Sequence, residues 1–119
     1  MDFIASILML YVDRYDFFLK LLIEHIVICL TAICLVTVIG IGLGICISRN
    51  KNLARVVLSV SDFIYTIPSI ALLGFLVVLT GIGNTSALIA IVMYGVLPVL
   101  RATYVGICEV DSQLVEAAV

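Results

Sequence analysis

The stretch from Ile26 to Ser48, IVICLTAICLVTVIGIGLGICIS, decides the fold class of this chain. Its 23 residues contain no charged side chain. As an α-helix it would be about 34 Å long, at about 1.5 Å per residue, and the hydrocarbon core of a bilayer is about 30 Å thick. The segment therefore predicts a transmembrane helix, with the bilayer as the solvent for this part of the protein.

Composition extends this conclusion to the whole chain. Of the 119 residues, 65% are hydrophobic and 12% are charged. An average soluble domain is about 45–50% apolar and about 25% charged. A water-soluble domain of this size could not cover so much apolar side chain, because small domains have little interior for their surface. A soluble globular protein is therefore excluded. The net charge of −2 says little about partners, and no nucleic-acid partner is expected.

Two further apolar segments, residues 56–80 and 85–106, predict a second and a third transmembrane helix. The turn Gly81–Asn84 separates them, and its glycine and asparagine residues suit positive φ angles. The uncharged part of the third segment is short, so we expect its helix to continue past Arg101, whose guanidinium reaches the inner headgroups. The predicted fold is an all-α polytopic membrane protein with three transmembrane helices, in a membrane domain over residues 26–119.

Residues 1–25 are expected to form an N-terminal leader and an interfacial helix. The apolar run Phe3–Val12 has 10 residues, too few to cross the hydrocarbon core as a helix. Asp2 stands where a cleavable signal would carry basic residues, so we expect a loosely ordered or interfacial leader. Residues 16–25 predict an amphipathic entry into the first span. Four rings suit an interfacial aromatic belt: Tyr11, Tyr15, Phe17 and Phe18.

Basic residues set the predicted orientation. Arg49, Lys51 and Arg55 directly follow the first span, and short loops rich in lysine and arginine favour the cytoplasm. The first span therefore runs from outside to inside, with the N-terminus outside the cell. Three spans then place the C-terminus in the cytoplasm.

Four residues of the second and third spans are candidates for a transport pathway or gate: Asp62, Tyr65, Pro68 and Pro98. An acid inside an apolar run is costly and is often functional. The alternative for Asp62 is an interfacial carboxylate that reaches back to Arg55. Each proline frees a carbonyl one turn earlier and bends its helix, which either shapes a cavity or is static geometry. The ring of Tyr65 could contact a quaternary ammonium group, or it could only pack.

The first span contains a pattern of small residues, and the chain's cysteines, histidine and acids form no expected metal or catalytic site. Gly40 and Gly44 form a Gly-x-x-x-Gly pattern, and such spacing lets two membrane helices approach closely. Glycines with no packing role are the alternative. The four cysteines form no Cys-x-x-Cys pair and His25 is the single histidine, so no metal site is expected. Glu109, Asp111 and Glu116, the acids of the final stretch, have no partner histidine for acid–base chemistry, so no catalytic residue is expected.

Four motifs in the second half of the chain carry a resemblance to a known family. They are Thr66-Ile-Pro-Ser-Ile-Ala-Leu-Leu73, Thr80-Gly-Ile-Gly-Asn-Thr85, Leu97-Pro-Val-Leu-Arg-Ala-Thr-Tyr104 and Asp111-Ser-Gln-Leu-Val-Glu-Ala-Ala118. With these motifs, the stretch from Ile67 to Ala118 resembles the membrane subunit of binding-protein-dependent ABC importers. It is most similar to the osmoprotectant branch, which carries glycine betaine, carnitine or choline. The resemblance implies the N-terminal part of a type I ABC importer permease fold.

The resemblance also implies partners. Glu116, Ala117 and Ala118 would begin a cytoplasmic coupling helix, over residues 112–119, that docks in a groove of an ABC ATPase subunit. That separate subunit would use ATP, so this chain would bind no cofactor and would not itself be an enzyme. An extracellular solute-binding protein or domain would deliver the solute. A second permease copy would complete the path, in the inner membrane of a bacterium.

The chain departs from the family pattern at its end. Family permeases continue past the Glu-Ala-Ala motif with a glycine and further membrane helices, whereas this sequence stops at Val119. We therefore expect a fragment of a permease, or a permease ended early at this motif. The alternative is a small three-span membrane interaction protein, such as a holin-like pore former or a regulator, with no transport role.

Overall fold

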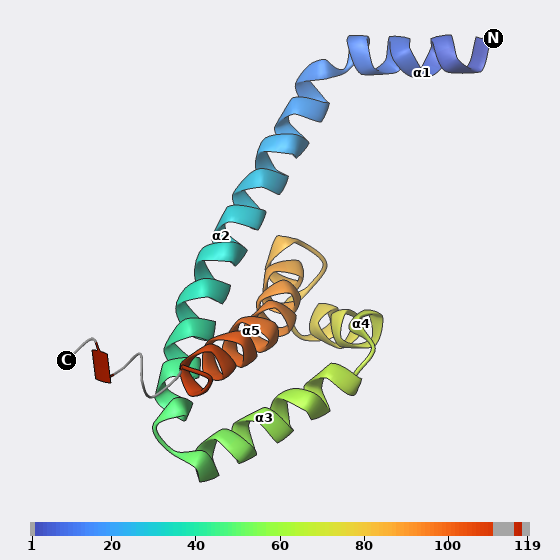
Figure 1. The fold of residues 1–119 in the computed structure, drawn as a ribbon. Helices are drawn as coiled ribbons and strands as arrows, with labels where there is room; N and C mark the ends of the chain where they lie inside the picture. The colour runs from blue at the N-terminus through green and yellow to red at the C-terminus, as the bar shows by residue number, and fades with distance from the viewer. Residues whose placement is uncertain (1, 111–115, 118–119) are drawn as a thin grey trace. The chain divides into compact units, whose positions relative to one another are not determined.

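A computed structural model of the chain describes residues 2–110 and 116–117. Five α-helices lie within residues 2–110 (Figure 1): α1 (Asp2–Asp13), α2 (Tyr15–Ser48), α3 (Lys51–Thr66), α4 (Ser69–Thr80) and α5 (Asn84–Cys108). The predicted all-α class is thus confirmed for the described part of the chain. The chain divides into two compact units, residues 1–31 and residues 32–119.

Two helices are long and apolar enough to cross a membrane, namely α2 and α5. The 34 residues of α2 and the 25 residues of α5 correspond to about 51 Å and about 37 Å of helix. α3 and α4 pass the same test only as a pair, and they are bent by 91° at the break between them. The described residues therefore contain two candidate spans, or three if the bent pair counts as one.

The structure differs from the predicted second span, residues 56–80, which is not one continuous helix (Figure 1). The break lies at Pro68, which lacks an N–H and restricts the residue before it to extended conformations. Ile67 is accordingly extended, with φ −75° and ψ 124°. Its N–H donates to the carbonyl oxygen of Ile64 at 3.1 Å, so the carbonyl that the proline would leave free is satisfied at the end of α3.

The first unit contains α1 and the beginning of α2. α1 is helical over Asp2–Asp13. The rings of Tyr11 and Phe18 stack with centroids 4.3 Å apart, and Phe17 meets Phe18 edge-on at 5.7 Å. Three of the four aromatic residues predicted for an interfacial belt thus pack together. α2 is one helix from Tyr15, so the predicted entry segment and the predicted first span are continuous.

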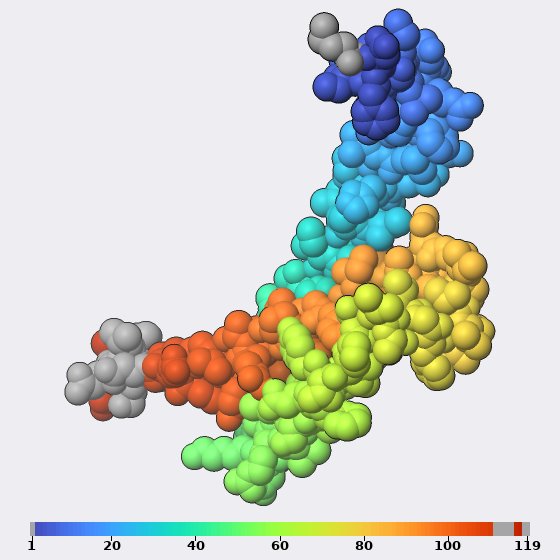
Figure 2. All heavy atoms as spheres, turned by 90° about the vertical axis from the view of Figure 1, so that its right-hand side faces the viewer, coloured from blue at the N-terminus to red at the C-terminus, as the bar shows by residue number. Residues whose placement is uncertain are grey.

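Three helices of the second unit meet in a small apolar core. Ile47 of α2, Ala54 of α3 and Leu100 of α5 are each at most 2% exposed and form one cluster. The turn between α2 and α3 supports this contact, because the side chain of Asn50 accepts hydrogen bonds from the N–H groups of Asn52 and Leu53 and caps α3. Figure 2 shows the yellow-green α3 lying against the orange α5. The core therefore fixes α3 beside α5.

α2 and α5 approach each other closely at two glycines. A Cβ built on Gly40 would lie 2.7 Å from Cγ1 of Val99, and one on Gly44 would lie 2.6 Å from Cβ of Thr103. Carbon atoms in ordinary contact are about 3.5–4.0 Å apart. Glycine at these two positions is what allows the helices this separation, and helix association in lipid depends on such packing.

In the turn between α4 and α5, the glycines have the predicted positive φ angles but the asparagine does not. Gly81 has φ 85° and Gly83 has φ 155°, conformations that glycine adopts without steric cost. Asn84 is the first residue of α5 instead. The hydroxyl of Ser86, a residue 1% exposed, donates to the carbonyl oxygen of Gly81. This bond joins the turn to the first helical residues of α5.

Candidate functional site

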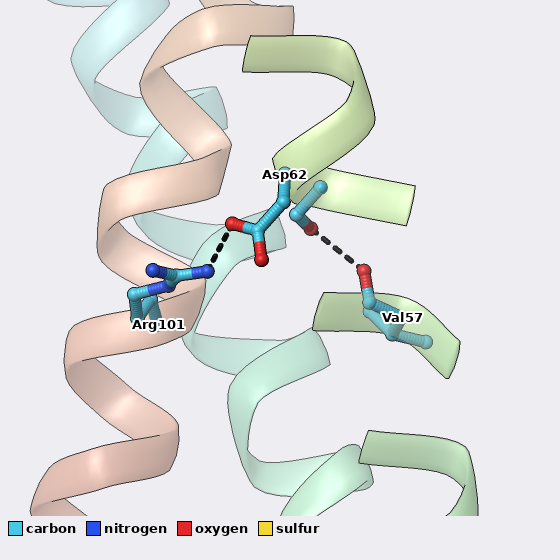
Figure 3. Close-up of polar contacts among 4 residues, drawn as sticks. Val57, Asp62 and Arg101 are labelled. Atoms are coloured by element: carbon cyan, nitrogen blue, oxygen red, sulfur yellow. Dashed lines mark hydrogen bonds and ion pairs between the residues drawn. The ribbon is translucent and has the colours of Figure 1, made fainter. Parts of the chain in front are cut away.

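An ion pair joins α3 to α5. The guanidinium of Arg101 donates from Nη2 to Oδ1 of Asp62 (Figure 3). The side chain of Arg101 is 52% exposed and that of Asp62 is 62% exposed. This contact corrects two expectations from the sequence. Arg101 faces a carboxylate of the same chain rather than reaching only for headgroups, and Asp62 pairs with Arg101 rather than with Arg55.

The ion pair lies in a cleft between α3 and α5. The cleft has a volume of about 330 Å³ and is lined by Ser61, Asp62, Tyr65, Leu97, Pro98 and Arg101. Pockets that hold small ligands begin at about 300 Å³. The cleft brings together three of the four residues predicted for a pathway or gate, from two helices far apart in the sequence. Pro68 is the fourth, and it does not line the cleft.

Helical spacing explains why these side chains share one side of each helix. Residues three or four apart lie on the same face of an α-helix. On α3, this spacing relates Tyr65 to both Ser61 and Asp62, and on α5 it relates Leu97 to Arg101. Ser61 is 5% exposed, and its hydroxyl donates to the carbonyl oxygen of Val57 at 2.8 Å (Figure 3). Its polar group is therefore satisfied without using the cleft.

A tyrosine pair connects the cleft to the break at Pro68. The hydroxyl of Tyr94, on α5, donates to the carbonyl oxygen of Ile67. The ring of Tyr94 meets the ring of Tyr65 edge-on, with centroids 6.2 Å apart and an angle of 71° between the planes. Irregular backbone in a membrane requires a partner of this kind for its polar groups. Tyr94 thus satisfies the backbone where α3 ends and holds Tyr65 at the edge of the cleft.

The predicted coupling residues lie far along the chain from this cleft. Glu116 and Ala117 are helical and exposed. Ala118 and most of the predicted coupling segment, residues 112–119, lie outside the described residues.

The chemistry available at the cleft is binding rather than bond making. It presents a carboxylate, a guanidinium and an aromatic ring to one space. Within residues 2–110 and 116–117, no group of three His, Cys, Asp or Glu side chains is placed to hold a metal ion. The arrangement suits the recognition of a small molecule by charge and by ring contact.

Sequence reasoning missed three residues that matter for this architecture. The sequence places Arg101 near the headgroups, whereas its partner Asp62 is 39 residues away, and local patterns do not reveal such contacts. Gly95 carries no repeat signal, yet a Cβ on it would lie 2.7 Å from Cγ2 of Val36. Ser86 could have been recognised as a polar residue just past a glycine turn, a position where hydroxyls bond the local backbone.

Comparison with known proteins identifies similar sequences. Residues 36–119 match the family described as "Binding-protein-dependent transport system inner membrane component". The chain is 39% identical over 94 residues to the choline transport system permease protein OpuBB of Bacillus subtilis (strain 168), an alignment that covers 79% of this chain and 43% of the relative. It is 38% identical over 94 residues, with the same coverage, to the glycine betaine/carnitine/choline transport system permease protein OpuCB of the same organism.

A third relative combines two functions in its name. The ergothioneine transport permease/ergothioneine binding protein EgtU of Helicobacter pylori (strain G27) is 36% identical over 85 residues, covering 71% of this chain and 15% of the relative. The chain thus spans less than half the length of these curated relatives. No solved structure matches it. Neither the family match nor the relatives favour the pore former or regulator considered as the alternative.

Proposed function

Because the chain belongs to the family of binding-protein-dependent transport system inner membrane components, we propose that it serves in the membrane-spanning permease subunit of an ATP-driven importer. It is an inner-membrane protein whose apolar helices α2 and α5 suit the bilayer. The observation that carries the proposal is the family match over residues 36–119, which includes the ion pair, the cleft and the glycine contacts between helices.

The proposed solutes are quaternary ammonium osmoprotectants such as glycine betaine, carnitine and choline. The names of two relatives, a choline permease and a glycine betaine/carnitine/choline permease, support this class. These solutes share a trimethylammonium group, which aromatic rings and carboxylates attract. The cleft offers both, in Tyr65 and Asp62.

The proposed partners are a cytoplasmic ABC ATPase, an extracellular solute-binding protein or domain, and a second permease copy. ATP would be bound and hydrolysed by the ATPase. This chain would supply part of the solute pathway and the segment that contacts the ATPase, rather than a catalytic site. The name of the ergothioneine relative, which joins a permease to a binding protein, supports a binding component on the outer side. The N-terminus would then lie outside the cell and the C-terminus in the cytoplasm.

The proposed coupling segment is the one that contains Glu116. This residue and Ala117 are helical and exposed, and together with Ala118 they would begin the coupling helix that contacts the ATPase. Small alanines permit close approach, and the carboxylate provides a polar anchor. Motion of the ATPase during hydrolysis would then be passed to α5, the helix that precedes this segment.

Co-purification with the ABC ATPase tests this proposal. We expect Glu116→Lys to reduce ATPase recovery and ATP-dependent uptake of glycine betaine by about tenfold or more, because a reversed charge at a buried interface contact typically costs several kcal/mol. Glu109→Lys is the matched control, since it reverses another exposed acid before the proposed contact, and it should retain both activities. Loss of neither activity in Glu116→Lys, or equal loss in both variants, would count against coupling through Glu116. An ATPase that never co-purifies with the unaltered chain would count against the importer itself.

A further inference from the structure

The ion pair in the α3–α5 cleft is incompletely coordinated. One guanidinium nitrogen of Arg101 meets one carboxylate oxygen of Asp62, so the contact is not the bidentate form that saturates both groups. The other N–H groups of Arg101 and the second oxygen of Asp62 form no hydrogen bond with any residue that the structure describes. Both side chains are more than half exposed. The cleft therefore offers a donor for an anion and an acceptor for a cation side by side.

Tyr65 adds a surface for the cation. Its ring lines the same cleft as the ion pair and is three residues from Asp62 on α3, which places both on one face of the helix. An aromatic ring and a carboxylate together attract a quaternary ammonium group, which cannot donate an N–H hydrogen bond. The edge-on contact with Tyr94, 6.2 Å between centroids, orients the ring from the other side.

Charge balance selects among solutes. Asp62 and Arg101 together carry no net charge, and a zwitterion added to them leaves the cleft neutral. A simple cation would leave one uncompensated charge, which is strongly disfavoured where the bilayer rather than water surrounds the cleft. A neutral cleft with separated positive and negative groups is thus better matched to a zwitterion than to a cation of similar size.

We propose that this cleft is a binding site for a zwitterionic quaternary ammonium carboxylate, of which glycine betaine is the simplest example. The solute carboxylate contacts the free N–H groups of Arg101, and its trimethylammonium group lies against Asp62 and the ring of Tyr65. The choice of this solute class rests on the proposed function, whereas the binding site rests on the geometry of the cleft. The site places selectivity in the membrane chain as well as in any separate binding component.

Equilibrium binding to the purified chain in lipid nanodiscs tests the site, with radiolabelled glycine betaine and choline as the two probes. We expect Arg101→Gln to weaken glycine betaine binding by about tenfold, the loss typical of one charge-assisted contact, and to leave choline binding unchanged or stronger. Asp62→Asn should weaken choline binding more than glycine betaine binding. Tyr65→Leu should reduce both affinities, because it removes the ring that contacts the trimethylammonium group.

Two controls separate a binding role from a structural one. Arg55→Gln removes an exposed cation of α3 that does not line the cleft, and it should change neither affinity. The exchanged pair Asp62→Arg with Arg101→Asp can restore the contact between helices but reverses the polarity beside Tyr65, so glycine betaine binding should stay weak. Full recovery in the exchanged pair would overturn the proposal. Equal losses for both probes in Arg101→Gln and in Asp62→Asn, or an absence of binding by the unaltered chain, would also overturn it.

Failure of the proposed binding site can be distinguished from failure of the proposed importer function. ATP-dependent uptake by the assembled transporter, without measurable binding to this chain, would overturn the zwitterion site and leave the importer intact. Selective binding with no uptake in the presence of the ATPase and ATP would support the site and count against the importer.

Discussion

At the residue scale, Gly40 and Gly44 set how closely two membrane helices can pack. Their hypothetical Cβ atoms would lie 2.7 Å and 2.6 Å from side-chain carbons of α5, so added atoms must push α5 away. Gly42, between them, has nothing within 4 Å of its hypothetical Cβ. The same helix thus contains both a constrained glycine and an unconstrained one, and the second is a matched control for the first.

We predict that Gly44→Ala destabilises the chain by about 1–3 kcal/mol, the usual cost of overpacking. Gly42→Ala should be neutral or slightly stabilising, because alanine is the better helix former. Unfolding of both variants in mixed detergent micelles, followed by circular dichroism, measures the difference. Equal stability of the two variants would show that the close approach of α2 and α5 is not a stabilising contact.

The sequence identified part of the candidate site at this scale. Asp62, Tyr65 and Pro98 stood out because each is unusual within an apolar helix, and all three line one cleft. Arg101 stood out only as a charge near the end of a span, and its contact with Asp62 depends on how α3 and α5 pack. The chemical character of each side chain can be recognised from the sequence. A contact between two residues 39 positions apart can be recognised only from the packing of the helices.

At the element scale, the break between α3 and α4 is the feature least visible in the sequence. Residues 56–80 read as one apolar run with a proline inside it, and membrane helices tolerate proline as a kink. At the observed bend of 91°, Tyr94 of α5 supplies a hydroxyl to the carbonyl oxygen of Ile67, a contact that the apolar run itself does not reveal. The long helices α2 and α5 were predictable from their own composition, and the bend was not.

We predict that Tyr94→Phe lowers stability by about 1–3 kcal/mol, since it leaves a backbone carbonyl without a partner. Tyr65→Phe is the control, because it removes a hydroxyl from the same ring pair without removing the bond to Ile67. Thermal unfolding in nanodiscs compares the two variants. A loss in Tyr65→Phe as large as that in Tyr94→Phe would assign the effect to the rings rather than to the carbonyl.

At the scale of the whole molecule, the bent pair decides the topology. α3 has 16 residues and α4 has 12, which gives about 24 Å and about 18 Å of helix. Neither length alone crosses a hydrocarbon core of about 30 Å. Joined at 91°, the two helices place their far ends about 30 Å apart. The pair can therefore cross the bilayer only if both helices are tilted, and otherwise it enters and returns on one side.

The two topologies place the C-terminal segment on opposite sides of the membrane. If the bent pair crosses, the turn at Gly81–Gly83 is outside and α5 returns the chain to the cytoplasm, where Glu116 can meet an ATPase. If the pair returns, the turn is cytoplasmic and α5 carries Glu116 outward. The proposed coupling role thus requires a crossing pair. The positive charges at Arg49, Lys51 and Arg55 favour a cytoplasmic location only for the N-terminal end of α3.

Single-cysteine labelling distinguishes these topologies. In a chain whose four native cysteines are replaced by serine, we predict that Ile82→Cys reacts with a membrane-impermeant maleimide in intact cells, because this residue is 94% exposed in the turn. Asn52→Cys, exposed beside the basic turn, should react only after the membrane is opened. Labelling of both positions only after opening would mean that the bent pair returns to the cytoplasmic side. That result would place Glu116 outside the cell and remove the physical basis for its contact with an ATPase, while the cleft formed by α3 and α5 would remain available to a solute.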